Sequence, residues 1–414
     1  MTTLSESAPG LLQQRPFVLF WLARLHVTIG YQMLALVIGW QVYELTNSAL
    51  DLGLVGLIQF VPAVLLTLLI GHAADRYDRR LIIRAAQSVY AFAALMITAA
   101  LLTQTISRDL LFAAVFLIGS ARAFEVPTGS ALVPALVPPP LIPRAVAAWT
   151  SANQTAVICG PALGGLLYAV KPVIVTALCV AFFLTAIALV TFIRPRQTAE
   201  KREPPTFSAV LAGIRYLFTR RRLLGVVTLD LFVVLLGSVT ALLPIYARDI
   251  LQVGPIGLGL LRSAPAVGAL TTAIMLSRRP IERHIGPTMF AVVAIYGFAT
   301  IVFGVSTWFP LSLFALAVLG ASDAVSIVVR FSLVQIETPD AMRGRVSAIN
   351  YLFVGSSNTL GDFESGAVAA WLGTVPAVLL GGIGSLLIAG TWMLLFPGLR
   401  RIDRYEPPKD DTRT

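Results

Sequence analysis

The sequence predicts an all-α integral membrane protein whose twelve transmembrane helices form two pseudo-symmetric six-helix bundles. Three observations predict this fold: an apolar composition, twelve apolar segments of about membrane length, and an internal repeat. Hydrophobic residues make up 57% of the 414 residues and charged residues only 13%, and the mean hydropathy is +0.82. A soluble domain could not bury so much apolar surface, so we expect lipid to be the solvent.

The apolar segments fall into two groups of six around a polar stretch. A helix that crosses the bilayer needs about 20 apolar residues, and each segment is about this long. The first group covers 17–43, 52–72, 81–104, 110–133, 145–169 and 172–193, and the second covers 222–247, 256–276, 287–306, 310–330, 345–371 and 374–396. We therefore expect an N-terminal bundle over 1–193, a linker over 194–221, a C-terminal bundle over 222–400 and a polar tail over 401–414.

Lysine and arginine residues are concentrated on one side of the predicted bilayer. Of the 31 basic residues, 24 lie on one side, in or next to the tails, the linker and alternate loops; four lie deeper inside spans, and three lie on the opposite side: Arg108, Lys171 and Arg248. Because basic loops stay in the cytoplasm, we expect a multi-pass protein of the cell (inner) membrane with both termini cytoplasmic. This distribution also argues against a nucleic-acid partner. We expect a monomer in the lipid bilayer.

The linker contains its own helical pattern. Pro195, Pro204 and Pro205 interrupt its first part, and apolar residues then recur at helical spacing from Phe207 to Phe218 beside several arginines. This pattern is typical of an amphipathic helix that lies on a membrane surface.

Parts of the first half recur in the second. GLIQFVPAV at 56–64 matches GLLRSAPAV at 259–267, an offset of 203, and the stretch from Gly119 matches that from Gly320 at an offset of 201. Transporters built from two such halves place the substrate site near the bilayer midplane, at the interface of the halves. The repeat therefore predicts a transporter architecture.

The sequence lacks the motifs of nucleotide hydrolysis and of common hydrolases. Lys171, Lys201 and Lys409 follow Val, Glu and Pro, so no P-loop is present, and neither HExxH nor GxSxG occurs. Cys159 and Cys179 lie inside apolar segments without metal-ligand spacing. We expect no enzyme activity, no cofactor and no metal site. An ion gradient would then drive transport.

Inserting an ionisable residue into a membrane span costs about 2.5–3.5 kcal/mol of free energy on insertion scales, so each such residue needs a structural or functional explanation. The carboxylates that we consider for proton coupling are Asp230, Glu125, Asp362 and Glu364. Arg122 stands three residues before Glu125, which predicts an intrahelical pair that is either structural or a proton site. Asp230 has no basic neighbour one turn away on its own helix. Its partner must come from another helix, or it is protonated, and it is our first proton-coupling candidate.

Polar residues inside spans also supply candidates for a substrate cavity. In the repeat, Arg262 aligns with Gln59, which predicts a cavity-facing position in both halves. The cavity candidates are Arg24, Gln32, Arg122, Arg262 and Arg330.

Several stretches resemble the major facilitator superfamily. Gly71 to Arg80, GHAADRYDRR, resembles the signature loop between its second and third helices, with Asp78 where the pattern usually has glycine. GPALGG at 160–165 resembles the core of the antiporter motif of drug exporters, although ordinary small-residue packing would also explain it. RGRVSAINYLFVGSSNTLGDFESG at 343–366 and DLFVVLLGSVTALLPIYARDIL at 230–251 are similar to the enterobactin-exporter-like branch.

The resemblance implies roles for the two motifs. The loop residues would act in conformational gating, and we expect Asp75 to dock at the start of a second-half helix near Arg345. A basic loop that only fixes topology is the simpler alternative. The gating set is Gly71, Asp75, Arg76, Arg79, Arg80 and Arg345, and the helix-motif set is Gly160, Pro161, Gly164 and Gly165.

The resemblance also implies a function. It implies secondary active export of an amphipathic small molecule, such as a drug or a siderophore, by proton antiport and alternating access. Two alternatives remain open from the sequence. One is an importer or uniporter of a metabolite, and the other is a membrane scaffold or sensor that does not transport.

Overall fold

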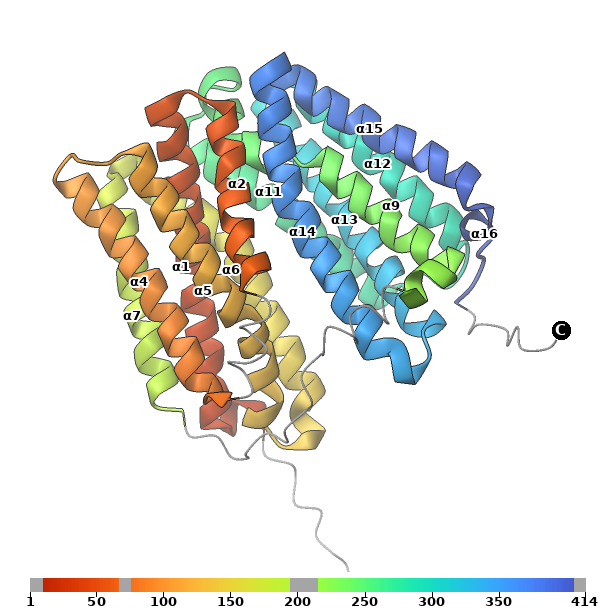
Figure 1. The fold of residues 1–414 in the computed structure, drawn as a ribbon, viewed down its shortest axis with the longest axis horizontal. Coiled ribbons are helices and arrows are strands. Elements are labelled where there is room, and N and C mark those ends of the chain that lie inside the picture. The colour runs from red at the N-terminus through yellow and green to blue at the C-terminus, as the bar shows by residue number, and fades with distance from the viewer. Residues whose placement is uncertain (1–9, 67–75, 194–214, 406–414) are drawn as a thin grey trace, which may run out of the picture. The chain divides into compact units, whose positions relative to one another are not determined.

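The computed structural model describes residues 10–66, 76–193 and 215–405, without the side chains of 340, 341, 343–345 and 347–353. All regular elements in these residues are helical (Figure 1). The long helices are α1 (Arg15–Thr46), α2 (Ala49–Leu65), α4 (Arg79–Leu102), α5 (Arg108–Leu132), α6 (Ile142–Val170), α7 (Pro172–Thr191), α9 (Arg221–Gly237), α11 (Gly254–Arg278), α12 (Ile285–Val305), α13 (Phe309–Glu337), α14 (Asp340–Leu372) and α15 (Thr374–Leu395). The short elements are η1 (Leu11–Gln13), η2 (Val133–Leu136), η3 (Pro139–Leu141), η4 (Thr240–Leu242), α10 (Leu243–Ile245), η5 (Tyr246–Ile250) and α16 (Pro397–Arg400).

Each of the twelve predicted spans overlaps a helix in the described residues, and the predicted all-α membrane fold is confirmed. In the described ranges, nine helices are long and apolar enough to cross a membrane. The other three predicted spans fall on α2, which has 17 described residues, and on the more polar helices α6 and α14. Most of the predicted amphipathic helix lies outside the described residues. Its end, 215–219, is helical, and Leu217 packs with Leu223 of α9 and Val334 of α13.

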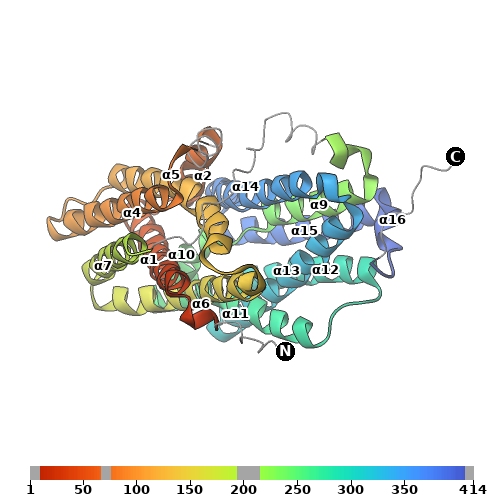
Figure 2. The same cartoon turned by 90° about the horizontal axis from the view of Figure 1, so that it is seen from below.

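The chain divides into two compact units. The first comprises residues 1–37 and 61–204, and the second comprises 38–60 and 205–414. In the first unit, α4 packs along both α5 and α7, as both views show (Figures 1 and 2). The fully buried side chains of Ile83, Leu111 and Phe183 mark this packing.

The long helices of the second unit pack against one another in one connected group. Helix α12 lies along α13 and α15, α11 lies along α13, and α9 lies along α14 and α15 (Figures 1 and 2). Residues 38–60 belong to this unit, and their α2 segment packs on α14 through two glycines. A Cβ added to Gly366 would lie 2.5 Å from Cα of Gly53, so only glycine allows this close approach.

The predicted span 222–247 is not one continuous helix. Helix α9 ends at Gly237, and Ser238 is extended with φ −66° and ψ 125° before η4, α10 and η5 follow. The Tyr296 hydroxyl donates to the Gly237 carbonyl at 3.0 Å, and the Ser365 hydroxyl donates to the Ser238 carbonyl at 2.6 Å. Irregular backbone is tolerated at membrane depth where protein groups satisfy it, and α12 and α14 supply those groups here.

Candidate functional site

An ion pair joins three helices inside the first unit. Arg24 of α1 donates from Nη1 to both carboxylate oxygens of Glu125 of α5, at 2.9 and 3.0 Å. Its Nη2 donates to Asn153 Oδ1 of α6 at 3.0 Å. The side chains of Arg24 and Glu125 are only 11% and 5% exposed. This pair therefore fixes α1, α5 and α6 to one another with charge-assisted hydrogen bonds in a protected setting.

Aromatic rings surround the same arginines. The Arg24 guanidinium lies 4.8 Å from the ring centre of Trp149, and that of Arg122 lies 4.3 Å from the ring centre of Tyr31. Both geometries are cation–π contacts. A cavity of about 60 Å³ lies among these groups and is lined by Arg24, Thr28, Tyr31, Gln32, Arg122 and Glu125, together with Tyr90, Asn153 and two valines. Three of the five predicted cavity residues, Arg24, Gln32 and Arg122, thus meet at one cavity.

The expected intrahelical pair between Arg122 and Glu125 is wrong. Within the described residues Glu125 forms its ion pair with Arg24, which lies 101 positions earlier in the chain. The physical reason is that α1 brings Nη1 of Arg24 within hydrogen-bond distance of both carboxylate oxygens, whereas Arg122 stacks on Tyr31. The spacing of three residues on α5 would allow Arg122 to reach Glu125. Arg24, on the neighbouring helix α1, has the better geometry for the ion pair.

The small residues of the GPALGG stretch lie where α6 crosses α1. A Cβ added to Gly160 would lie 2.6 Å from Cβ of Gln32, and one added to Gly164 would lie 3.1 Å from Cα of Met33. These glycines let α1 approach closely and hold Gln32 at the edge of the cavity.

The second unit contains its own buried ion pair. Arg330 of α13 donates from Nη1 to Asp230 Oδ2 of α9 at 2.5 Å, and the Ser326 hydroxyl lies 3.4 Å from Asp230 Oδ1. The two charged side chains are 3% and 6% exposed. Of the two alternatives that the sequence left for Asp230, the structure provides the partner from another helix.

A cavity of about 10 Å³, roughly the space of one water molecule, adjoins this pair. Asp230, Tyr296, Ser326 and Asp323 line it together with four valines and Ser322. Asp323 was not among the predicted proton-coupling residues. The available signal was its spacing: Asp323, Ser326 and Arg330 stand at i, i+3 and i+7 on one face of α13.

Asp362 and Glu364 have different hydrogen-bond partners in the described residues. Asp362 accepts a hydrogen bond from the Ser238 hydroxyl at 2.7 Å and another from the backbone amide of Ala241, so it caps the turn that follows the end of α9. Glu364 is half-buried, and Ser365 lies 3.4 Å from it. Arg262 of α11 lies beside Gly39 of α1, outside both ion-paired clusters.

The described part of the signature loop ties helix ends together in the first unit. Arg79 donates to the Ala131 carbonyl near the end of α5 at 3.0 Å, and Arg80 donates to the Ile193 carbonyl just beyond α7 at 2.7 Å. Cations are favoured at the carbonyl ends of helices. Asp78 accepts from the Arg80 backbone amide and caps α4. Its side-chain hydrogen bond with Arg80 holds the pKa of the Asp78 carboxyl below its usual value.

Part of the gating prediction lies outside the described residues. Gly71, Asp75 and the side chain of Arg345 fall there, and Arg76 is exposed. The docking of Asp75 near Arg345 stays a prediction.

The comparisons with known proteins place this geometry in a family. Residues 5–410 match the family described as transmembrane secretion effector. The chain belongs to this family of the major facilitator superfamily. The enterobactin exporter EntS of Salmonella typhimurium (strain LT2) is 27% identical over 414 residues, which cover 97% of each chain. That of Escherichia coli O1:K1 is 26% identical over 412 residues, 97% of this chain and 96% of its own.

A solved structure has a similar fold. A bacterial homologue of the human lysosomal transporter Spinster has a TM-score of 0.75 at 12% identity, over 97% of this chain and all of the other. At this identity the likeness shows the fold alone. From its family and its fold, the chain is a multi-pass membrane transporter of the major facilitator superfamily and not an enzyme.

Proposed function

We propose that the protein exports an amphipathic, acidic small molecule from the cytoplasm in exchange for protons. The observation that carries this proposal is Arg122. Its guanidinium stacks on Tyr31 and lines a cavity, and no carboxylate forms an ion pair with it in the part of the chain that the structure describes. A positive charge at a cavity inside a membrane protein points to an anionic ligand.

The cavity lining supports a substrate that combines acidic and aromatic groups. Two guanidinium groups and one carboxylate leave one positive charge in excess, and Tyr31 and Tyr90 offer ring faces. Gln32 and Asn153 add amide groups. Siderophores fit this description, and the curated relatives are named enterobactin exporters. We therefore choose enterobactin as the first compound to test.

The second cluster supports proton coupling. Asp230 and Asp323 bring two carboxylates to one small cavity, and Arg330 brings one guanidinium. One bound proton would complete the charge balance of the cluster, because a second ionised carboxylate buried without its own cation is costly. We propose that this cluster, with Asp230 in the ion pair and Asp323 beside it, takes up and releases the coupled proton. Glu125 is second in rank because Arg24 binds both of its oxygens.

The transport proposal is tested in proteoliposomes loaded with enterobactin and subjected to an imposed pH gradient. We expect gradient-driven flux that Arg122→Gln lowers at least about tenfold, since a charge-assisted hydrogen bond contributes about 1.5–3 kcal/mol. Arg279→Gln, an exposed arginine outside the cavity, is the matched control and should transport normally. Flux that does not depend on the pH gradient would favour a uniporter. The absence of flux with every siderophore, dye and drug tested would favour a scaffold that does not transport.

The proton proposal is tested with Asp230→Asn and Asp323→Asn. We expect both variants to lose the dependence of export on the pH gradient while binding of substrate remains measurable. Asp109→Asn, an exposed carboxylate in the first turn of α5, is the control. Full gradient dependence in Asp323→Asn and Asp230→Asn would move the assignment to Glu125.

A further inference from the structure

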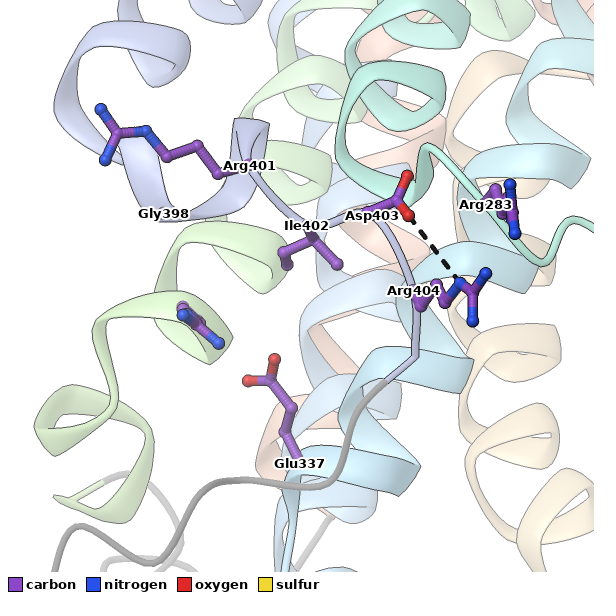
Figure 3. Close-up of a pocket in the computed structure, with 8 residues that line it drawn as sticks. Arg283, Glu337, Gly398, Arg401, Ile402, Asp403 and Arg404 are labelled. Atoms are coloured by element: carbon purple, nitrogen blue, oxygen red, sulfur yellow. Dashed lines mark ion pairs between the residues drawn. The ribbon is translucent and has the colours of Figure 1, made fainter.

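A pocket of about 590 Å³ lies at one end of the second unit, where α9 and α12 begin and α13 ends. This volume is in the range of about 300–1,000 Å³ that ligand sites occupy. Figure 3 shows Arg401 on one side of the pocket and Arg283 and Arg404 on the opposite side. The charged groups that line it are Arg222, Arg283, Glu337, Arg401, Asp403 and Arg404.

The segment 399–405 is a fixed wall of this pocket. The backbone amide of Gly286 donates to the Ile402 carbonyl at 2.9 Å, and the amide of His284 donates to Asp403 Oδ1 at 3.1 Å. Leu399 is completely buried. Because these contacts hold the segment across the start of α12, Arg401 and Arg404 are placed before any ligand arrives.

The pocket carries an excess of positive charge. Asp403 is occupied by the His284 amide and lies 3.9 Å from Nε of Arg404. Among the described residues, no carboxylate forms an ion pair with Arg222, Arg283 or Arg401. Four guanidinium groups thus face two carboxylates, and the concentration of one sign of charge in a recess attracts anions.

Two exposed leucines precede, in the chain, the segment that forms the wall of the pocket. Leu394 and Leu395, in the last turn of α15 just before α16, are 79% and 57% exposed. Exposed leucines at the end of a membrane-spanning helix are positioned to meet acyl chains, and the arginines follow directly at the helix ends. An amphiphile could place its hydrocarbon tails against the exposed leucines and its anionic head against the arginines.

We propose that this pocket binds the phosphodiester headgroup of an anionic phospholipid. Arginine matches the oxygens of a phosphodiester with paired N–H donors, which a diffuse positive surface does not provide. The pocket shares no lining residue with the substrate and proton clusters, so the proposal stands or fails independently of the transport proposal.

The test measures lipid binding to the purified full-length chain in a neutral detergent by native mass spectrometry. Phosphatidylglycerol is titrated against phosphatidylcholine with the same acyl chains, and inorganic phosphate is tested separately. We expect phosphatidylglycerol to bind at least about tenfold more tightly than phosphatidylcholine, and Arg283→Gln/Arg404→Gln to remove this difference. Arg278→Gln/Arg279→Gln removes the same charge from exposed positions outside the pocket and should bind like the unmodified chain.

Three results would overturn the proposal: equal binding of the two lipids, an equal loss in both double variants, or competition by inorganic phosphate at the same concentration as the lipid. The last result would identify a soluble anion as the occupant. If Arg283→Gln/Arg404→Gln does not fold, Arg283→Lys/Arg404→Lys keeps the charge and removes the paired donors. We expect this lysine variant to bind phosphatidylglycerol severalfold more weakly than the unmodified chain does. Binding equal to that of the unmodified chain would contradict the proposal.

Discussion

Arg24 donates hydrogen bonds from both of its terminal nitrogens to neighbouring helices. Its Nη1 binds both carboxylate oxygens of Glu125, and its Nη2 binds Asn153. A charged residue that is buried with its partner tolerates the low dielectric, but the same residue left alone does not. The described residues of each unit contain such a pair, and we have proposed roles in substrate binding or proton coupling for residues of both pairs.

This coupling gives a prediction at the residue scale. Glu125→Gln and Arg24→Gln should each lower the free energy of unfolding by about 3–5 kcal/mol, because each leaves a buried charge without its partner. The double variant Arg24→Gln/Glu125→Gln should be more stable than either single variant. Unfolding of the detergent-purified chain measures the double-mutant cycle. Additive losses would show that the two residues do not stabilise each other.

At the scale of elements, the interruption after α9 is the largest departure from a simple bundle. Ser238 leaves the helical conformation, and donors from α12 and α14 satisfy the two carbonyls at the interruption. Asp362, a carboxylate that the sequence presented as a proton site, accepts hydrogen bonds from this same turn. The polar residues of α14 thus stabilise a helix end in another part of the second unit.

The corresponding prediction concerns Ser365. Ser365→Ala removes the donor to the Ser238 carbonyl and should lower the free energy of unfolding by about 1–3 kcal/mol, the cost of a buried polar group without a partner. Hydrogen exchange should also quicken at the amides of η4 and α10. Ser356→Ala on the same helix is the control, and an equal effect there would rule out a specific contribution of the interruption.

At the scale of the whole molecule, the sign of the loop charges predicts the orientation. In a chain whose Cys159 is replaced by serine, Thr105→Cys should react with a membrane-impermeant maleimide in intact cells. Glu282→Cys should react only after permeabilisation, because its loop contains basic residues. Cys179 is fully buried and should not react. Labelling of Glu282→Cys in intact cells would reverse the orientation.

Composition and segment length were enough to predict the all-α membrane fold and the positions of its long helices, because the bilayer sets the length of each span. The pairing of side chains was not predictable in the same way. Glu125 found Arg24 on α1 rather than Arg122 on its own helix, and Asp230 found Arg330 on α13. Such partners depend on how helices pack, and spacing along one helix carries no information about it. The interruption at Ser238 was also missed, since its satisfying donors lie on α12 and α14.

The segment 399–405 has a consequence for biosynthesis. The ribosome makes the start of α12 long before it makes Asp403, which lies 119 positions after His284. Until then the amides of Ile285 and Gly286 lack the carbonyls that later accept from them. A nascent chain therefore holds one unfinished helix start throughout the insertion of α13, α14 and α15. A product that stops short of Leu399 never supplies these two carbonyls, so its α12 would begin without the partners that the full-length chain provides.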